Sequence, residues 1–425
     1  MKKTGELRLI QDCRPLNKAM NKPPNMFLPL IHDIIRDVLS SEYVGCADAI
    51  SMFYQFGLSE TIQQYFAVLL SGGRGITVEG RFTRMPMGFS FAPCIGQRCA
   101  NVLIRDLGRA WVDNFLVMAK TQEQYEKNRA TFLERCAKVG MQLDSTDLTP
   151  QRQFCSLGVA FDLDTKLYKL DPEWAEKSAT KLSNLVERPM TVRQLYECAN
   201  TITWRNHVMK RSLCYVPYIL NGLSVYGSRI AHKTIGWEDI VDVSPELLSE
   251  LRMEIAILRE NAPRGLDVET KAEVDIWTDA SLSHAAYLIF RNHVLIASGQ
   301  IALPDQHIFY SELYTAIEAL KHSRRLGHKS ANIFIDNAPA AICVERRVSS
   351  NFAANRKLAT LPNDLSTRVT WVDTTSQLAD PYTRPATSRH KFPPSIPPIG
   401  TPSQVFIDTT TGANDTVRAR GLHTF

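Results

Sequence analysis

The chain has 425 residues, of which 44% are hydrophobic and 22% are charged, and its formal net charge is +5. These values are ordinary for a globular protein with a large core and roughly two to four domains. No apolar run reaches the roughly eighteen residues that span a bilayer, and the N-terminus lacks the apolar stretch of a secretory signal, so no membrane partner is expected.

The nine cysteines are scattered along the chain and include no CxxC pair. They therefore predict neither a zinc site nor a disulfide framework. This cysteine usage favours a reducing, intracellular location, with cytoplasm and nucleus both open.

The first 165 residues alternate between expected strands and helices, which indicates an α+β arrangement. The expected helices are IHDIIRDVLSS and residues 122–139, and the expected strands are LRLIQDC, YVGCADAI, FAVLLS, WVDNFLVMA and FCSLGVAFDL. Within WVDNFLVMA, apolar residues flank the polar pair Asp113 and Asn114, which indicates two short strands joined by a tight turn. Asp113 is then expected at the tip of a hairpin.

The rest of the chain changes character twice. Residues 166–269 are expected to be mostly helical, with helices in DPEWAEKSATKLSNLV, TVRQLYECANTITWRNHVMKRSL and SPELLSELRMEIAILREN. Residues 270–385 combine the strands VDIWTDAS, AYLIFRNHVLIASGQI and ANIFIDNA with the helix FYSELYTAIEALKHSRRL, which predicts a compact α/β domain. Residues 386–425 are proline-rich and polar, which favours a linker or a disordered tail.

Basic and aromatic residues gather between residues 179 and 235. This stretch holds eight Lys or Arg residues against two acidic ones, interleaved with Trp204, Tyr215, Tyr218 and Tyr226. Such interleaving suits a polyanion with stackable bases, that is, a nucleic acid. A solvated helical face with a few core aromatics is the other interpretation.

Two carboxylates stand at the ends of expected strands, since Asp48 ends one strand and Asp113 lies at the hairpin tip. On adjacent strands, their oxygens could hold divalent metal ions. Two such ions a few ångströms apart can activate a 3′-hydroxyl and stabilise a leaving pyrophosphate. Taken alone, two aspartates at strand ends more often cap turns.

Five ordered motifs around these aspartates resemble the polymerase domain of retroelement reverse transcriptases. They are GELRLIQDCRPLNK, CADAISMFYQF, RMPMGFSFAPCIGQR with Pro86, Gly88, Pro93 and Gln97 in register, WVDNFLV, and FCSLGVAF. The resemblance implies a right-hand polymerase fold in residues 1–165, with a palm and with fingers that are partial because the chain begins at the fingers motif.

The resemblance also assigns roles by position. Asp48 and Asp113, with the backbone carbonyl of Ala49, would bind two Mg²⁺ ions, for which Mn²⁺ can substitute. Asn114 stands where the family usually has a second aspartate at the hairpin, and an amide oxygen can ligate a metal but brings no charge. Six residues are expected to bind the incoming dNTP. Arg8 and Lys3 would contact the triphosphate, and Phe53 would lie under the sugar and exclude a 2′-hydroxyl. The residues expected around the nucleotide are Met87, Gly88 and Gln97. An ordinary core role is the other interpretation of Phe53.

Four further acids occur in order within residues 270–385, namely Asp279, Glu312, Asp336 and Asp380. If they converge, they repel one another unless cations neutralise them, which makes two-metal phosphodiester hydrolysis the natural chemistry. Their motifs resemble the ribonuclease H domain that follows the polymerase in retroelements. The segment from Trp237 resembles the one that precedes this domain in gypsy-type and tyrosine-recombinase (DIRS-type) elements. Many cellular relatives have a histidine before the last aspartate, whereas residues 337–379 contain none.

These resemblances predict a reverse transcriptase with ribonuclease H activity, whose partners are an RNA template, a DNA primer, dNTPs and the RNA–DNA hybrid. Residues 166–269 would form a helical thumb and connection that follows the hybrid backbone. The candidate contacts there are Trp204, Arg205, Lys210 and Arg211. Asn114 keeps two other hypotheses open: a polymerase-inactive relic that retains ribonuclease H cleavage, and a non-catalytic nucleic-acid-binding scaffold. The oligomeric state is not predicted.

Overall fold

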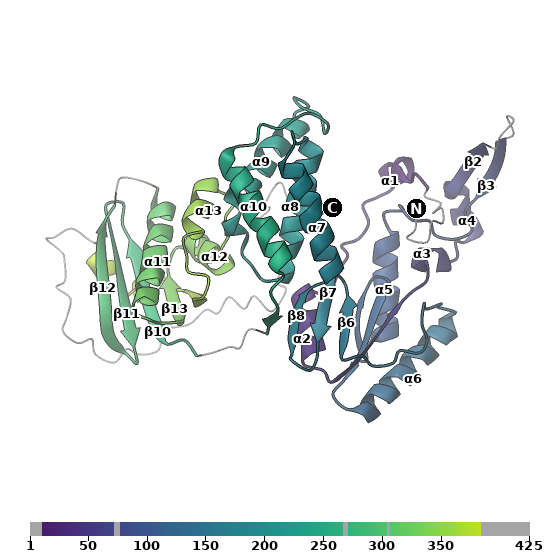
Figure 1. Ribbon diagram of the computed structural model, residues 1–425, viewed down its shortest axis with the longest axis horizontal. Coiled ribbons are helices and arrows are strands. Elements are labelled where there is room, and N and C mark those ends of the chain that lie inside the picture. The colour runs from purple at the N-terminus through teal and green to yellow at the C-terminus, as the bar shows by residue number, and fades with distance from the viewer. Residues whose placement is uncertain (1–10, 72–76, 267–270, 304–306, 384–425) are drawn as a thin grey trace. The chain divides into compact units, whose positions relative to one another are not determined.

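The computed structural model describes residues 11–71, 77–266, 271–303 and 307–383 (Figure 1). The chain folds into two compact units, of which the first is Met1–Lys181 with Ile255–Asp267 and the second is Leu182–Glu254 with Val268–Phe425. Across the described ranges, no helix is both long enough and apolar enough to cross a bilayer. The tail expected over residues 386–425 lies outside these ranges.

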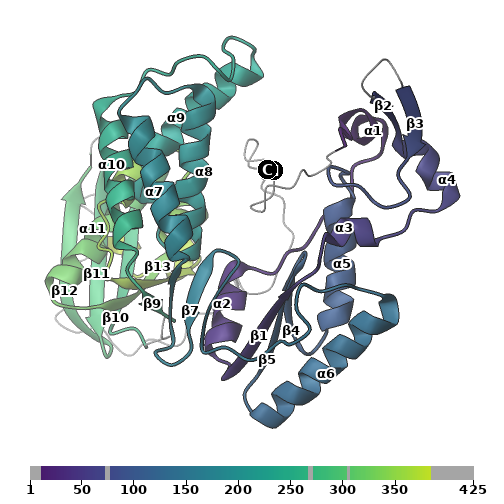
Figure 2. The same ribbon diagram turned by 45° about the vertical axis from the view of Figure 1, so that its right-hand side comes forward.

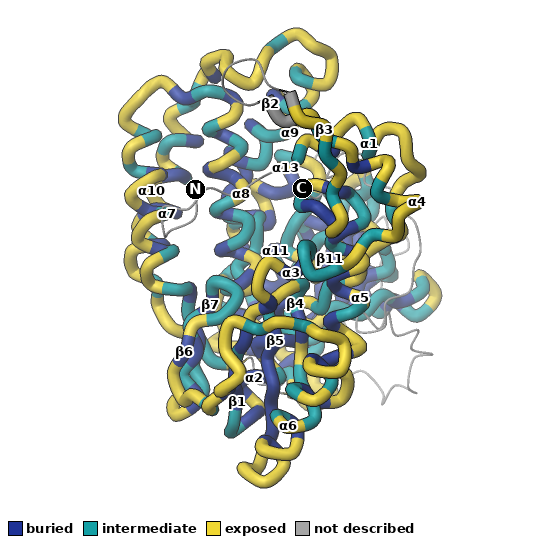
Figure 3. Tube along the Cα trace, turned by 90° about the vertical axis from the view of Figure 1, so that its right-hand side faces the viewer, coloured by how far each residue is buried: buried dark blue, intermediate teal, exposed yellow. Residues whose placement is uncertain are grey.

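A three-stranded antiparallel sheet in the order β1-β5-β4 forms the centre of the first unit. Its strands are β1 (Tyr43–Asp48), β4 (Gly108–Trp111) and β5 (Asn114–Ala119). The central strand β5 is buried from Phe115 to Ala119, as its dark blue trace shows (Figure 3). A short continuous apolar run is typical of a strand that is buried on both faces. The two strands and the tight turn expected around Asp113 are therefore confirmed.

Helices α5 (Ala92–Ile104) and α6 (Gln122–Val139) pack against this sheet (Figure 2). Helix α6 has the bounds that the sequence predicts, because both of its ends carry strong signals. At its start the Thr121 side chain accepts the N–H of Gln124, and at its end Gly140 takes a left-handed φ of 69°.

The remaining elements of the first unit are short. They comprise the helices α1 (Arg14–Ala19), α2 (Ile31–Leu39), α3 (Met52–Gln55) and α4 (Glu60–Gln63), the 3-10 helix η1 (Gln64–Phe66), and the hairpin of β2 (Ala67–Ser71) and β3 (Thr77–Arg81). A second antiparallel sheet, in the order β6-β7-β8-β9, contains β6 (Gln153–Ser156), β7 (Val159–Asp162), β8 (Leu167–Leu170) and β9 (Arg264–Gly265).

Two expected strands differ from the structure. FCSLGVAFDL forms the hairpin β6–β7 and not one strand, because Leu157 and Gly158 both take positive φ values (54° and 73°) and reverse the chain. LRLIQDC lies mostly outside the described residues, and its described part, residues 11–13, is not a strand.

Helices form the first part of the second unit, as expected. They are α8 (Val192–Val208), the 3-10 helix η3 (Leu213–Tyr215) and α9 (Pro217–Ala231), while α7 (Pro172–Val186) and α10 (Pro245–Glu260) each contribute residues to both units. A capping box starts α8, in which the Thr191 side chain accepts the N–H of Gln194 and the Gln194 side chain accepts the N–H of Thr191.

A buried ion pair in these helices corrects one prediction. Arg205 Nη1 lies 2.8 Å from Oε2 of Glu254, and the two side chains are 3% and 1% exposed. The Arg211 guanidinium bonds the other oxygen of the same carboxylate. A buried charge that loses its partner is costly, so these groups are committed to one another. Arg205 is thus a core residue and not the nucleic-acid contact that the sequence predicts, and Arg211 is largely engaged by Glu254.

Glu250, one helical turn before Glu254, makes stability depend on pH. Its carboxylate accepts the N–H groups of Tyr218 (3.1 Å) and Ile219 (2.9 Å) at the start of α9. Burial raises the pKa of Glu250 from 4.5 to about 7, and the Glu254 carboxylate adds to the increase. Because the folded pKa exceeds the unfolded one, this contribution to stability is complete below pH 4.5 and is lost as the pH rises through 7.

We expect Glu250→Gln to have a free energy of unfolding close to that of the unchanged protein at pH 5, and a larger one at pH 8 by on the order of 2 kcal/mol. Urea denaturation of the full chain at the two pH values measures the difference. Glu260→Gln, at an exposed position of the same helix, is the control. A difference of the same size at both pH values would contradict this expectation.

A five-stranded mixed sheet in the order β12-β11-β10-β13-β14 forms the rest of the second unit. Its strands are β10 (Val274–Ala280), β11 (His284–Arg291), β12 (Val294–Ala302), β13 (Ser330–Ile335) and β14 (Ser366–Trp371). Strands β10, β11 and β12 pair antiparallel, whereas β13 and β14 are parallel to β10. The β11–β12 hairpin turns at Asn292 and His293, which both have positive φ, as a two-residue turn of this hand requires.

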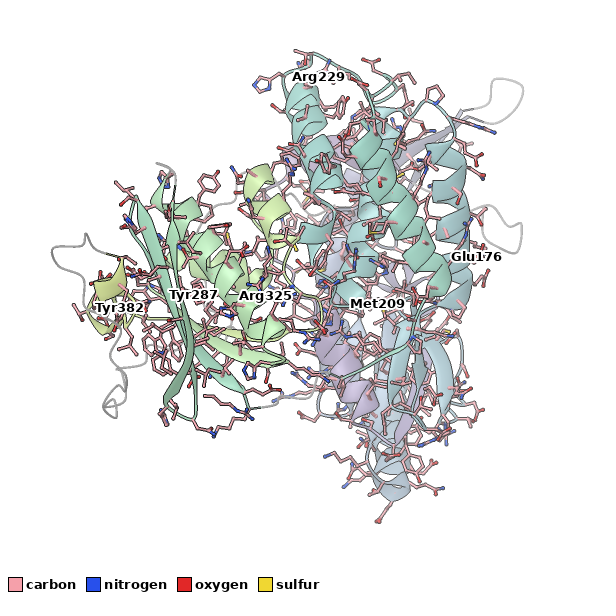
Figure 4. All side chains as sticks on the ribbon, turned by 60° about the vertical axis from the view of Figure 1, so that its left-hand side comes forward. Glu176, Met209, Arg229, Tyr287, Arg325 and Tyr382 are labelled. Atoms are coloured by element: carbon pink, nitrogen blue, oxygen red, sulfur yellow. The ribbon has the colours of Figure 1, made fainter. Side chains whose placement is uncertain are left out.

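Apolar side chains cover both faces of this sheet, because successive residues of a strand point to opposite faces. Helices α11 (Ile308–Arg325), α12 (Ala338–Arg346) and α13 (Phe352–Leu358) contribute to the core that contains Ile276 of β10. Trp277 belongs to a different core, together with Tyr382 of the 3-10 helix η5 (Asp380–Tyr382) (Figure 4). The compact α/β arrangement expected for this region is confirmed.

Candidate active sites

Asp48 and Asp113 lie at the same end of the central sheet of the first unit. In the β1–β5 register Asp48 is paired with Asn114, the residue after Asp113. The N–H of Ala49 donates to the Asp113 carbonyl at 2.8 Å and so ties the hairpin turn to β1. Both aspartates are exposed, so their carboxylates are accessible to a cation or a substrate.

The turn that carries Asp113 is strained and is held by Gln97 of α5. Val112 in this turn has a φ of 54°, which costs a β-branched residue on the order of 1 kcal/mol or more. Its N–H donates to Gln97 Oε1 at 2.7 Å, and Gln97 Nε2 donates to the Ala110 carbonyl at 3.0 Å. Gln97 is only 2% exposed. Gln97 thus positions the hairpin through its amide, and its expected place in the nucleotide pocket remains a prediction.

Asp144 is a third carboxylate at this site, and no sequence motif pointed to it. Its Oδ1 accepts the N–H of Asp48 at 2.8 Å, and its own N–H donates to the Asp48 carbonyl at 2.8 Å. Loss of hydration raises the pKa of the Asp48 carboxyl, and the Asp144 and Asp113 carboxylates raise it further. Repulsion of this kind is relieved when a divalent cation binds. Asn114, whose Nδ2 lies 3.3 Å from Asp113 Oδ1, adds no charge to this set.

The residues expected to bind dNTP lie in different settings, and their roles remain predictions. Phe53 is half-buried against an apolar cluster that includes Phe66 and Phe89. Met87 is partly buried, and Gly88 has a φ of 96° with the Gln11 carbonyl 3.1 Å from the place of a Cβ, so the backbone itself favours glycine there. Arg8 and Lys3 lie outside the described residues.

Two of the expected nucleic-acid contacts keep some exposure. Trp204 is half-buried, with its ring 6.4 Å from that of His207, and Lys210 is exposed. Arg211 lies over the Tyr215 ring at 5.0 Å in addition to its bond with Glu254. Contact of Trp204 and Lys210 with a nucleic acid remains a prediction.

The second unit brings together three of the four acids predicted for a nuclease site. One oxygen each of Asp279, Glu312 and Asp336 lies within 4.8 Å of the others, and we call these three residues the carboxylate cluster. Asp279 is near the end of β10 and Asp336 follows β13, and the carboxyl ends of parallel strands meet at one edge of a sheet. Glu312 reaches this edge from α11. Asp380 lines the same pocket, of ≈ 680 Å³, without being one of the three.

The carboxylate cluster is chemically suited to a divalent cation. Asp279 and Glu312 are 4% and 3% exposed. Burial raises the pKa of Asp279 to about 7 and that of Glu312 to about 9, and neighbouring carboxylates add to both increases. Glu312 Oε1 accepts the N–H of Ala280 at 3.1 Å, whereas no group in the described residues donates to its buried Oε2. A buried carboxylate oxygen without a donor, beside two aspartates, fits a cation ligand.

Comparison with known sequences agrees with the resemblance of the N-terminal motifs to reverse transcriptases. Residues 1–160 match the family described as "Reverse transcriptase (RNA-dependent DNA polymerase)". The chain is similar to the "Retrovirus-related Pol polyprotein from transposon 412" of Drosophila melanogaster, with 28% identity over 142 residues, or 32% of this chain and 11% of that protein. It is also similar to the "Transposon Tf2-7 polyprotein" of Schizosaccharomyces pombe, with 26% identity over 139 residues, or 32% of this chain and 10% of that protein. The chain thus spans about a tenth of the curated relatives that it matches.

Two solved structures of a foamy viral protease-reverse transcriptase share the fold. One, "dRH in complex with ds DNA", has a TM-score of 0.51 at 16% identity and covers 87% of this chain and 64% of that chain. The other, in complex with dsDNA, has a TM-score of 0.50 at 15% identity and covers 88% of this chain and 76% of that chain.

The described residues thus share their fold with these two structures, and Asp48 and Asp113 lie at one end of the central sheet. Residues 1–160 are a reverse transcriptase domain similar to those of retroelement polyproteins, which confirms the resemblance read from the motifs. The gypsy or DIRS subtype remains a prediction.

Proposed function

We propose that this chain extends the 3′ end of a DNA primer on an RNA or DNA template, with dNTPs as substrates. The observation that carries the proposal is the pairing of Asp48 with Asn114, which brings Asp48 and Asp113 to one end of the sheet in a region that matches reverse transcriptases. Residues 1–165 would act as palm and partial fingers, and residues 166–269 as thumb and connection.

In the proposed reaction the primer 3′-hydroxyl attacks the α-phosphate of the dNTP in line, and pyrophosphate leaves. Asp48 and Asp113, with the Ala49 carbonyl, would hold two Mg²⁺ ions, which activate the hydroxyl and neutralise charge on the leaving group. Asp144 holds the Asp48 backbone through two hydrogen bonds, and Gln97 holds the turn before Asp113. The backbone that carries each carboxylate is therefore held before substrate arrives, which lowers the cost of reaching the reactive geometry.

Asn114→Asp is expected to increase Mg²⁺-dependent primer extension by about tenfold to 100-fold. Asn114 is the cross-strand neighbour of Asp48, so the substitution adds negative charge where the cations would bind. Primer extension on poly(rA)/oligo(dT), with Mg²⁺ and then with Mn²⁺, measures the change. The unchanged protein should extend weakly and improve with Mn²⁺. No extension by either protein with either ion would refute the polymerase proposal.

A second activity, ribonuclease H cleavage of RNA in an RNA–DNA hybrid, is favoured by the convergence of Asp279, Glu312 and Asp336. Residues 270–385 would form this ribonuclease H-like domain, with Asp380 in the lining of its pocket as the fourth acid. Two Mg²⁺ ions at the carboxylate cluster would supply an activated water that cuts the RNA strand. The expected result is fragmentation of labelled RNA in a hybrid, but not of the same RNA as a single strand.

Three measurements on one preparation separate the hypotheses. The proposed enzyme extends a primer and cuts a hybrid, whereas a polymerase-inactive relic cuts the hybrid without extending a primer. A nucleic-acid-binding scaffold binds the hybrid in a gel-shift experiment and performs neither reaction.

A further inference from the structure

Two threonine hydroxyls contact the carboxylate cluster, and no sequence motif pointed to either. Thr383 Oγ1 donates to Asp279 Oδ2 at 2.7 Å, and Thr374 Oγ1 donates to Asp336 Oδ2 at 3.0 Å. Both threonines line the pocket that holds the cluster. Each of the two aspartates therefore has one carboxylate oxygen bound by a hydroxyl.

Thr383 is a buried residue of this pocket lining. It is 3% exposed and directly follows Tyr382, which packs on the sheet (Figure 4) and whose carbonyl accepts Gln300 Nε2 at 3.0 Å. The Thr383 hydroxyl also lies 2.9 Å from the Asp380 carbonyl. A hydroxyl has one proton to donate, and a charged carboxylate is the stronger acceptor, so the bond to Asp279 dominates when Asp279 is ionised.

Thr374 reaches Asp336 from the rim of the pocket. It is exposed and begins the 3-10 helix η4 (Thr374–Ser376), which is capped by the Asp373 side chain. The backbone of Asp336 is held as well, because Trp371 Nε1 donates to its carbonyl at 2.8 Å. Asp336 is thus fixed through its main chain and through its carboxylate.

We propose that Thr374 and Thr383 are positioning residues that fix the rotation of the Asp336 and Asp279 carboxylates for a divalent cation. The inference rests on the proposed nuclease function. A charge-assisted hydrogen bond to one oxygen restricts rotation about the Cβ–Cγ bond, and ligands oriented in advance bind a metal more tightly. Groups that orient metal ligands in this way typically contribute about 10- to 100-fold in metal affinity or activity.

The test compares Thr383→Val and Thr374→Val, which remove a hydroxyl at nearly constant shape, with Thr383→Ser and Thr374→Ser, which retain it. Thr375→Val is the matched control, because the Thr375 hydroxyl bonds Asp373 and not the cluster. Binding of Mn²⁺ to the full chain is measured from the electron paramagnetic resonance signal of the free ion. Asp279→Asn serves as the blank for Mn²⁺ bound elsewhere, and the Mg²⁺ concentration that gives half-maximal hybrid cleavage is the second measurement.

Each valine variant should weaken the Asp279-dependent Mn²⁺ binding by about tenfold or more and raise the Mg²⁺ requirement to a similar extent. The serine variants and Thr375→Val should behave as the unchanged protein does. Since Thr374 is exposed, its variants keep the test valid if the buried Thr383→Val does not fold.

Valine variants that bind Mn²⁺ as the unchanged protein does would overturn the proposal, as would the lack of any Asp279-dependent binding. If the unchanged protein cuts no hybrid while its Mn²⁺ binding still depends on both hydroxyls, the nuclease function is wrong and the positioning role stands.

Discussion

Asp48→Asn should lower the rate of primer extension by at least about 1,000-fold, which corresponds to about 4 kcal/mol in activation free energy. Asp48 ends β1 and is one of the three carboxylates of this site, with Asp113 and Asp144. The substitution removes its charge while keeping its size. The bonds of Asp144 to residue 48 involve only the residue 48 backbone, so the substitution leaves them in place. Hybrid cleavage is expected to remain unchanged, because its carboxylates belong to the other unit.

Primer extension and hybrid cleavage measured on the same preparation check this result. Asp106→Asn is the matched control, because Asp106 is exposed in the same unit and its φ of 63° is readily adopted by asparagine. Extension by Asp48→Asn at the rate of this control would refute the role of Asp48 as a metal ligand. Loss of both activities would instead indicate that the fold is damaged.

Asp279→Asn should abolish hybrid cleavage, with a loss of at least about 1,000-fold, and should leave primer extension intact. Asp279 is a buried member of the carboxylate cluster, and its amide replacement contributes no charge to a bound cation. The same substitution removes the Asp279 charge that repels the buried Glu312 carboxylate. The metal-free variant is therefore expected to be at least as stable as the unchanged protein, so that its inactivity reports chemistry and not misfolding.

Cleavage of a labelled hybrid measures this loss, and thermal denaturation in EDTA measures the stability. Asp275→Asn is the control on the same strand β10, since Asp275 bonds Asn332 Nδ2 at 3.0 Å and does not line the pocket. Cleavage by Asp279→Asn at the level of Asp275→Asn would show that the cluster is not the nuclease site.

Local signals predicted the elements well where their causes are local. Helix α6 was predicted to its end residues because Thr121 caps its start and Gly140 ends it. The hairpin around Asp113 followed from two apolar runs and a polar pair, and the order of the motifs indicated that Asp48 would be its neighbour. The error at FCSLGVAFDL has a local cause as well, because Leu157 takes a positive φ that a leucine rarely adopts.

Charge and residue type alone could not predict which basic residues of the helical region are exposed and which are buried. Arg205 lies in a basic, aromatic stretch that suits a nucleic acid, yet it is paired with Glu254, 49 residues further along the chain. Nothing in the sequence around Arg205 distinguishes it from Lys210, which is exposed. Burial depends on which helices pack together, and that is a property of the tertiary structure.

The sequence by itself was enough to identify the reverse transcriptase domain and the four acids of a second site, because motif order and spacing are properties of the sequence. Only the tertiary structure showed which side chains bond the acids of the two sites or the residues next to them. Gln97 bonds a residue 15 positions away, Asp144 one 96 positions away, and Thr383 one 104 positions away. Such polar contacts form between groups that only the folded chain brings together, so sequence spacing does not encode them.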